Sequence, residues 1–147
     1  MNTSAHILLV EDNRMDVELT LDAFREVRLE NQVSVVWTGE EALDYLFGKG
    51  QYTDRNKYPV PDMILLDLKL PGIDGFDVLR KVKNTPILKR IPIIVLTSST
   101  DEGDRALSYD NGVNSYLVKP VSFGGFLEVV SKIEDYWISL NVGPPKE

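Results

Sequence analysis

The chain has 147 residues, 43 % of them hydrophobic, which suits one domain with a substantial core and excludes a disordered tail. Its net charge of −7 argues against non-specific nucleic-acid binding, and the absence of cysteine excludes disulfides, thiol catalysis and zinc–thiolate sites. No apolar run approaches the roughly 20 residues that span a bilayer, and residues 1–6 lack a signal sequence. We therefore expect a cytoplasmic protein with neither nucleic acid nor membrane as a partner.

The predicted elements alternate between short strands and amphipathic helices. Each strand segment is rich in Ile, Val and Leu without polar–apolar alternation, which is typical of strands buried on both faces. Each helix segment carries apolar residues at helical spacing. In chain order they are strand 7–10, helix 14–28, strand 33–37, helix 39–47, strand 63–66, helix 74–84, strand 93–96, helix 101–110, strand 115–118 and helix 122–138.

The helices differ in the strength of their apolar pattern. In the first helix the expected buried face runs from Met15 through Phe24 to Val27. The fourth helix is the weakest and offers mainly Ala106 and Leu107. The fifth helix has the clearest stripe, which we interpret as core packing. That stripe consists of Phe123, Phe126, Leu127, Val130, Ile133 and Trp137.

Five strands alternating with five helices predict an α/β fold with a parallel sheet covered on both faces. Right-handed crossovers favour a flavodoxin-like, doubly wound sheet of strand order 2-1-3-4-5. We expect residues 1–147 to form a single domain, with its core at about 6–138 and a C-terminal tail at 139–147. Residues 48–61 are polar and rich in Gly and Pro, which predicts a long irregular loop.

Polar residues follow the predicted strands at their carboxyl ends. Glu11 and Asp12 follow the first strand, Asp67 follows the third, and Lys119 follows the fifth. Thr97 closes the fourth strand and is followed by two serines. Because ligands of doubly wound sheets bind outside the carboxyl ends of the strands, we expect these separated pieces of chain to meet in one crevice.

This combination of residues indicates phosphoryl transfer onto Asp67. Three carboxylates held together repel one another unless a cation neutralises them, and oxygen ligands suit Mg²⁺ or Mn²⁺ better than zinc. A lysine and a hydroxyl would help to hold a phosphoryl group. A carboxylate is already nucleophilic at neutral pH, so no general base is needed.

Taken singly, each of these residues has an ordinary structural explanation. An Asp at a strand end commonly caps backbone amides. Lys119 alone is a solvated lysine, and Thr97 alone is a strand residue. Only their conjunction at one sheet edge favours a functional site, since packing makes no such demand.

Four motifs in this order resemble the receiver domains of two-component response regulators. The resemblance covers residues 6 to about 138, and every motif lies at its expected strand end. The motifs are LLVEDN (8–13), ILLDLKLPGIDG (64–75), VLTSS (95–99) and SYLVKP (115–120).

The resemblance implies a role for each matching residue around the acceptor carboxylate. Asp67 would be the phospho-acceptor, and Asp12 would bind the divalent cation directly with assistance from Glu11. The backbone carbonyl of Lys69 would complete the protein's share of the metal coordination. Lys119 would contact the phosphoryl group.

The resemblance also implies a conformational switch. Thr97 would be the switch hydroxyl and Tyr116 the switch aromatic, acting on the surface formed by the fourth helix, fifth strand and fifth helix. The peptide bond preceding Pro120 is usually cis in the family, and Lys69 and Ser99 occupy positions that modulate loss of the phosphoryl group.

The implied partner is a sensor histidine kinase. The long loop at 48–61, the segment LKRIPIIVLTSS and the Tyr136–Trp137 ending resemble single-domain regulators that work with bacteriophytochrome-type kinases. The chain ends soon after the fifth helix, so we expect no output module and no enzymatic activity beyond its own phosphotransfer and dephosphorylation. Four residues offer more apolar area than one helix face needs, which suggests a homodimer: Val129, Tyr136, Trp137 and Ile138. For Trp137, burial against the domain's own sheet is an equal alternative.

Three other classes remain as alternatives. A Mg-dependent phosphohydrolase with an Asp nucleophile would want a second Asp two residues after Asp67, where Lys69 stands. A flavin carrier would want a Ser/Thr/Gly-rich loop after the first strand, where the sequence is the acidic EDNRMD. A structural receiver-like adaptor would usually have lost a site residue, and none is missing.

Overall fold

The computed structural model describes residues 6–27, 33–119 and 122–133. Within these ranges, five parallel strands form one sheet in the order β2-β1-β3-β4-β5. This confirms the predicted flavodoxin-like, doubly wound fold. The strands are β1 (Ile7–Val10), β2 (Val33–Val36), β3 (Met63–Leu66), β4 (Ile93–Thr97) and β5 (Ser115–Val118).

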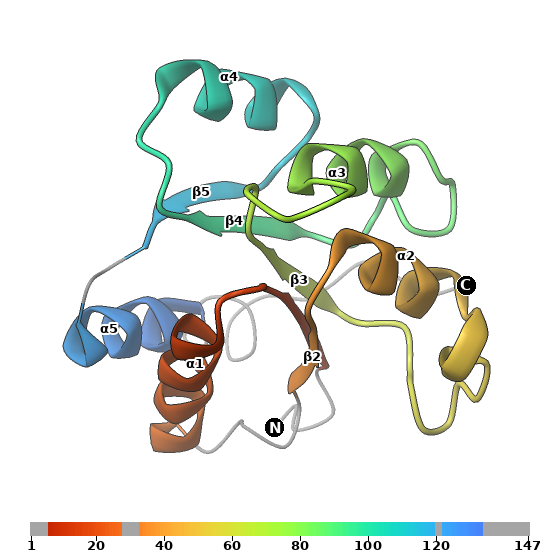
Figure 1. The fold of residues 1–147 in the computed structure, drawn as a ribbon, viewed down its shortest axis with the longest axis horizontal. Helices are drawn as coiled ribbons and strands as arrows, with labels where there is room; N and C mark the ends of the chain where they lie inside the picture. The colour runs from red at the N-terminus through yellow and green to blue at the C-terminus, as the bar shows by residue number, and fades with distance from the viewer. Residues whose placement is uncertain (1–5, 28–32, 120–121, 134–147) are drawn as a thin grey trace.

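Five helices cover the two faces of the sheet (Figure 1). On one face α1 (Arg14–Glu26) lies beside α5 (Phe123–Ile133). On the other lie α2 (Gly39–Phe47), α3 (Gly75–Lys83) and α4 (Glu102–Asp110). Alternate strand residues feed two separate cores, so that Leu8 and Ile64 pack toward α2 and α3 while Leu9 and Leu65 pack toward α1.

Apart from the end of α5, which falls where the description of the chain stops, the strands and helices begin and end within one or two residues of the predicted positions. The second strand ends at Val36 instead of 37, and the fourth includes Thr97. The central strands β1 and β3 are buried throughout, as predicted for strands covered on both faces. The edge strands β2 and β5 are mostly half-exposed, because each has a neighbouring strand on one side only. The predicted helical residues 134–138, with Tyr136, Trp137 and Ile138, lie outside the described part of the chain.

Several predicted core positions are wrong. Met15 is 72 % exposed, and Val17, two residues later in α1, is buried instead. Phe123 is also exposed, although Val130 on the same stripe is buried. In α4, whose residues are all described, Ala106 and Leu107 face solvent and Ser108 alone is buried. This helix is therefore the one held least by apolar packing.

The segment 48–61 is more ordered than an irregular loop. It contains a short 3₁₀ helix, Gly50–Tyr52, and its Tyr52 and Tyr58 rings pack against each other and against Tyr45 of α2. The Arg55 guanidinium donates hydrogen bonds to the carbonyls of Tyr45, Leu46 and Tyr58. These bonds satisfy carbonyls at the end of α2, so the segment forms a fixed extension of that helix. Across the described ranges no helix has the length and apolar character that a membrane crossing requires.

Candidate functional site

The ends of β1 and β3 bring the first acidic residues together. Val10 pairs with Leu66 in the parallel register, and the residues that follow are Glu11 and Asp67. The Asp67 N–H donates to the Val10 carbonyl at 3.1 Å, which extends the ladder one step beyond the strand. Both side chains are thus fixed by the backbone of the sheet at its carboxyl edge, the place predicted for them.

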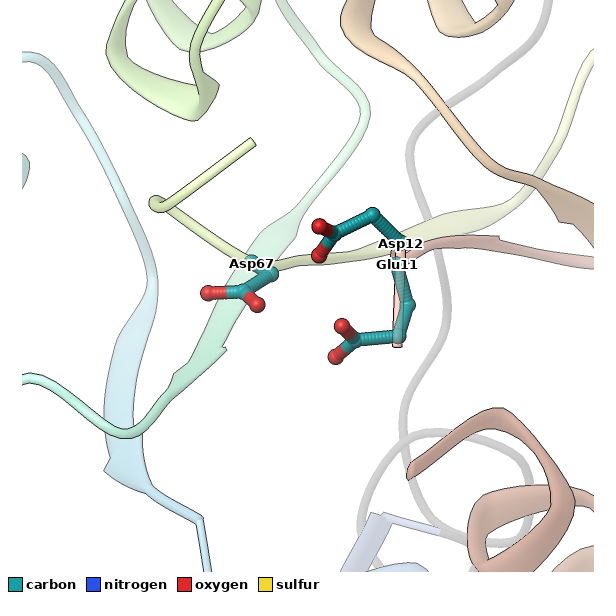
Figure 2. A group of neighbouring side chains, drawn as sticks. All are labelled: Glu11, Asp12 and Asp67. Atoms are coloured by element: carbon teal, nitrogen blue, oxygen red, sulfur yellow. The ribbon is translucent and has the colours of Figure 1, made fainter. Parts of the chain in front are cut away.

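Glu11, Asp12 and Asp67 form a cluster of carboxylates. One oxygen from each lies within 4.8 Å of the others, and Figure 2 shows the three carboxyl groups gathered at the ends of the two strands. Glu11 and Asp67 are buried, whereas Asp12 is exposed. The cluster therefore combines two buried carboxylates with one, that of Asp12, that faces solvent.

Lys119 bridges this cluster from the last strand. Its ammonium lies 2.6 Å from Glu11 Oε1, 3.0 Å from Asp67 Oδ2 and 2.7 Å from Asp16 Oδ2. Only 8 % of its side chain is exposed. The Lys119 N–H donates to the Thr97 carbonyl at 2.7 Å, which holds the residue at the end of β5. The prediction that Lys119 lies with the acids at one sheet edge is confirmed in geometry.

The charges in the crevice depend strongly on one another. Burial raises the pKa of Glu11 to about 7, and the negative charge of Asp67 acts in the same direction, against the hydrogen bond from Lys119. Burial disfavours the charged form of Lys119, but hydrogen bonds to Asp16 and Glu11 and the charge of Asp67 outweigh it and raise the pKa of the lysine. Lys119 therefore stays cationic, and the Glu11 carboxylate is poised near neutrality.

The turn after β3 is held close to the acceptor position. The Lys69 N–H donates to Asp67 Oδ1 at 3.2 Å, so the backbone of Lys69 lies beside the cluster. The Gly75 N–H donates to the Leu68 carbonyl at 2.9 Å, and a Cβ at Gly75 would lie 2.6 Å from the Leu68 Cα. Glycine is required here because α3 begins directly against the backbone that carries Asp67.

Thr97 and Tyr116 lie at the β4–β5 side of the same edge. Thr97 is fully buried, and its Oγ1 accepts a hydrogen bond from the Ser99 N–H at 3.4 Å. The Tyr116 hydroxyl donates to the Ser99 carbonyl at 3.0 Å, and its ring packs against the core on the α3 side. The residue before Pro120 is described, but Pro120 itself is not, so the expectation of a cis bond lies outside the described residues.

Two further acidic residues contact the residues of this site, and the sequence did not predict either of them. Asp16, in the first turn of α1, contacts Lys119. Asp104, in the first turn of α4, accepts a hydrogen bond from Ser99 Oγ at 2.6 Å and pairs with Lys69 Nζ at 3.2 Å. The Ser99 hydrogen bond and, after it, Lys69 lower the pKa of Asp104. An acid in a first helical turn commonly serves the helix dipole, so the sequence held no signal for either contact.

The donor set fits a hard divalent cation. The cluster offers carboxylate oxygens alone, its net charge is negative even with Lys119 included, and the exposed Asp12 leaves it open to solvent. Oxygen donors of this kind suit Mg²⁺ or Mn²⁺, which keep several waters when bound. The arrangement can hold a cation beside Asp67 while Lys119 supplies a second positive charge.

The fold and this crevice together define a flavodoxin-like domain built to hold charged groups at the carboxyl edge of its sheet. The family model of the response regulator receiver domain matches residues 7–131. The chain belongs to the response regulator receiver domain family.

Individual relatives match over nearly the whole chain. The probable methanogenesis regulatory protein FilR2 of Methanothrix harundinacea is 40 % identical, over 94 % of this chain and 86 % of its own. Response regulator Rcp1 of Synechocystis is 38 % identical over 90 % of this chain and 88 % of its own. The crystal structure of the phosphorylated cyanobacterial phytochrome response regulator RcpA superposes with a TM-score of 0.87 at 40 % identity, covering 96 % of this chain and all of that one. These comparisons give no support to the phosphohydrolase alternative.

Proposed function

We propose that the chain accepts a phosphoryl group from a sensor histidine kinase on Asp67 and signals through a surface that changes on phosphorylation. The observation that carries the proposal is the position of Lys119, whose ammonium joins Asp67 to Glu11 in a buried crevice. A structural acid would not need a second acid and a lysine at the end of a different strand.

The chemical step is a direct displacement at phosphorus. A carboxylate oxygen of Asp67 attacks the phosphorus of the kinase's phosphohistidine, the P–N bond breaks, and the imidazole retains its electron pair and later takes a proton from solvent. The product on Asp67 is an acyl phosphate. The Lys119 ammonium, 3.0 Å from Asp67 Oδ2, neutralises charge on the transferred oxygens.

Glu11, Asp12, Asp67 and the backbone carbonyl of Lys69 would hold the divalent cation, Mg²⁺ or Mn²⁺. Support comes from the oxygen donors of the cluster and from the crystal structure of the Mn²⁺-bound form of Rcp1, which superposes with a TM-score of 0.85 at 36 % identity over 96 % of this chain and 99 % of that one. Bound there, the cation would offset the charge of the phosphoryl oxygens during transfer.

Thr97 and Tyr116 would transmit the effect of phosphorylation from Asp67 to the surface of the domain. The Thr97 hydroxyl moves to hydrogen-bond a phosphoryl oxygen, and Tyr116 enters the space that it leaves. The close contact of both residues with Ser99 supports this pairing, because a movement of the Thr97 side chain disturbs the peptide that the Tyr116 hydroxyl binds. The movement would favour a different conformation of the surface formed by α4, β5 and α5.

That surface would bind a second copy of the chain. Of the side chains that the structure describes on these neighbouring elements, four apolar ones are exposed. They are Leu107 and Tyr109 of α4, Val118 of β5 and Phe123 of α5. The side chain of Val129 and residues 136–138, which the sequence also suggested for a homodimer, are outside the described part.

The remaining assignments follow the family. The chain would act as one receiver domain over residues 1–147, without turnover of external phosphate esters, in the cytoplasm and without nucleic-acid or membrane partners. A bacteriophytochrome-type kinase is the favoured donor, because the phytochrome response regulator RcpA and the related Rcp1 are similar over nearly the whole chain.

The decisive test is labelling with a small phosphodonor. Wild-type protein with acetyl phosphate and Mg²⁺ is expected to gain one phosphoryl group by intact-mass analysis, and Asp67→Asn is expected to gain none while keeping its circular dichroism spectrum. Asp110→Asn, an exposed acid of α4, serves as the matched control and should label normally. Labelling of the Asp67→Asn variant would contradict the assignment, and hydrolysis of a phosphate ester by the wild type would restore the phosphohydrolase alternative.

The donor is tested separately by phosphotransfer profiling. Autophosphorylated kinases from the genome that encodes the chain, both phytochrome-type and others, are each mixed with the chain. Phosphoryl transfer is then measured after short incubation times. Preferential transfer from the phytochrome-type kinases is expected, and faster transfer from any other kinase would contradict that partner.

A further inference from the structure

Asp16 is a fixed partner of Lys119 that lies outside the carboxylate cluster. Its Oδ2 is 2.7 Å from the Lys119 ammonium, and 25 % of its side chain is exposed. Its N–H donates to the helix-capping Asn13 Oδ1, and its carbonyl accepts a hydrogen bond from the buried Thr20 hydroxyl. The backbone of Asp16 is therefore held from both sides within the start of α1, and its side chain reaches a residue 103 positions away.

Lys119 and a divalent cation compete for the same oxygens. Two of the three acids in the cluster, Glu11 and Asp67, are also direct partners of the lysine. Like charges repel strongly in a buried site, so a cation that binds Glu11 and Asp67 pushes the ammonium away from them. Among the ion pairs that the Lys119 ammonium makes with described residues, the pair with Asp16 is the one whose acid does not belong to the cluster.

We propose that Asp16 is a positioning residue that retains the Lys119 ammonium on the α1 side of the crevice when the cation binds, so that Glu11 and Asp67 are freed for the metal and the lysine remains beside the acceptor. This inference rests on the proposed function. Without the Asp16 charge, the ammonium has Glu11 and Asp67 alone as partners, and it opposes the cation more strongly.

The test is a double-mutant cycle read by metal binding. Mn²⁺ affinity is measured by calorimetry for the wild type, Asp16→Asn, Lys119→Met and the double variant. Asp16→Asn is expected to raise the Kd for Mn²⁺ about fivefold, within the range of couplings between contacting charges. In the Lys119→Met background the same substitution is expected to change the Kd by less than about twofold, because no ammonium remains to be positioned.

A loss of equal size in both backgrounds would overturn the proposal, since it would show that Asp16 acts only as a distant negative charge. An unchanged Kd in Asp16→Asn would overturn it as well. Asp16→Glu keeps the charge and is expected to recover most of the affinity, and failure to recover would count against the charge as the cause. Equal thermal unfolding midpoints for these variants separate positioning from loss of structure.

The rate of phosphorylation provides an independent test of the role of Asp16. At saturating Mg²⁺, Asp16→Asn is expected to be labelled by acetyl phosphate more slowly than wild type, because the displaced lysine has no anchor near Asp67. Equal rates at saturating metal would contradict this part of the proposal. A wild type that fails to label on Asp67 would refute the proposed function, whereas the calorimetric coupling between Asp16 and Lys119 would still decide the inference.

Discussion

At the scale of single residues, Gly75 is a position where a methyl group cannot be placed without a shift of the backbone. A Cβ there would meet the carbonyl oxygen of Asp67 and the Cα of Leu68, which are backbone atoms that cannot turn aside. We expect Gly75→Ala to lower the free energy of unfolding by roughly 3 kcal/mol, the upper range for overpacking, and to weaken metal binding by displacing Asp67. Urea denaturation and calorimetry measure the two effects.

Gly124 provides the matched control for that substitution. It lies exposed in α5, and a Cβ added there would have no neighbouring atom within 4 Å. Gly124→Ala is expected to raise the free energy of unfolding by about 0.5 kcal/mol, because alanine loses less backbone entropy in a helix. Equal effects at the two glycines would contradict the close approach of α3 to Asp67.

A second prediction concerns the pH dependence of metal binding. The pKa of Glu11 is about 7 in the folded protein, above its ordinary 4.5, so between these values the folded, metal-free protein keeps a proton that the unfolded chain has lost. A cation that binds Glu11 must displace this proton. The apparent affinity for the metal should therefore fall by about tenfold per pH unit as the pH drops below 7. The metal-free protein should instead lose stability as the pH rises through this window.

Calorimetric titrations of Mn²⁺ from pH 5 to pH 8 measure this dependence. Glu11→Gln has no ionisable carboxyl group at this position, so it should bind Mn²⁺ more weakly and with a flatter pH profile over the same interval. A wild-type affinity that is constant across the interval would show that Glu11 is ionised throughout.

Residues at strand ends were predictable, and residues on helices were not. Glu11, Asp67 and Lys119 each follow a short apolar run, and the geometry of a parallel sheet brings such positions together. Asp16 has no such signal, because its partner is 103 residues away and nothing in a helical turn specifies which strand it faces. Met15 was wrongly expected in the core for a similar reason, since the apolar pattern of α1 allowed either it or Val17 to face the sheet.

At the scale of elements, α4 is attached more by polar contacts than by apolar ones. Ser108 is its only buried residue, while Asp104 joins it to Ser99 after β4 and to Lys69 after β3. These two contacts connect the helix to the loop that follows Asp67 and to the loop after the neighbouring strand β4. A helix attached in this way can shift at low cost when those loops change.

We therefore predict that Asp104→Asn loosens α4 selectively. The substitution removes the negative charge that pairs with Lys69 and weakens the hydrogen bond from Ser99, so amide exchange in residues 102–110 should become severalfold faster. Exchange in β1 and β3 should stay unchanged. Hydrogen-exchange mass spectrometry measures both regions.

Arg105→Gln is the control for this prediction. Arg105 pairs with Glu102 at 3.9 Å on the exposed face of the same helix, and such surface pairs contribute little. Similar acceleration in the two variants would show that Asp104 has no special role in holding α4.

The prediction of elements succeeded where apolar runs were continuous and failed where side chains from distant segments decide the structure. The five strands follow directly from their Ile, Val and Leu content. The segment 48–61 has two glycines near its start and two prolines near its end, yet Arg55 and the tyrosines fix it against α2. Those contacts are formed between side chains and carbonyls, and local composition does not reveal them.

At the scale of the whole molecule, the exposed apolar residues of α4, β5 and α5 predict that the chain dimerises through this surface when it is phosphorylated. Light scattering is expected to show a doubled mass when the acceptor is phosphorylated or loaded with beryllofluoride. Tyr109→Glu should keep the protein monomeric under the same conditions, because it places a charge in the apolar surface, while labelling of Asp67 continues.

Ile87 supplies the control, since its side chain is at least as exposed as that of Tyr109 but lies in the turn after α3. Ile87→Glu should leave dimer formation intact. A monomeric wild type in the presence of phosphodonor would refute the homodimer, and loss of the dimer in both variants would show that the charge acts without regard to the surface.

The bridge formed by Lys119 has a consequence for the order in which the protein acquires its activity. The three clustered acids belong to the first half of the chain, whereas their positive partner arrives with the last strand of the sheet. A growing polypeptide on the ribosome therefore lacks the lysine that offsets these charges until β5 has been added to the edge beside β4. We therefore expect competence to receive a phosphoryl group to coincide with completion of the sheet, since the ammonium beside Asp67 is supplied last.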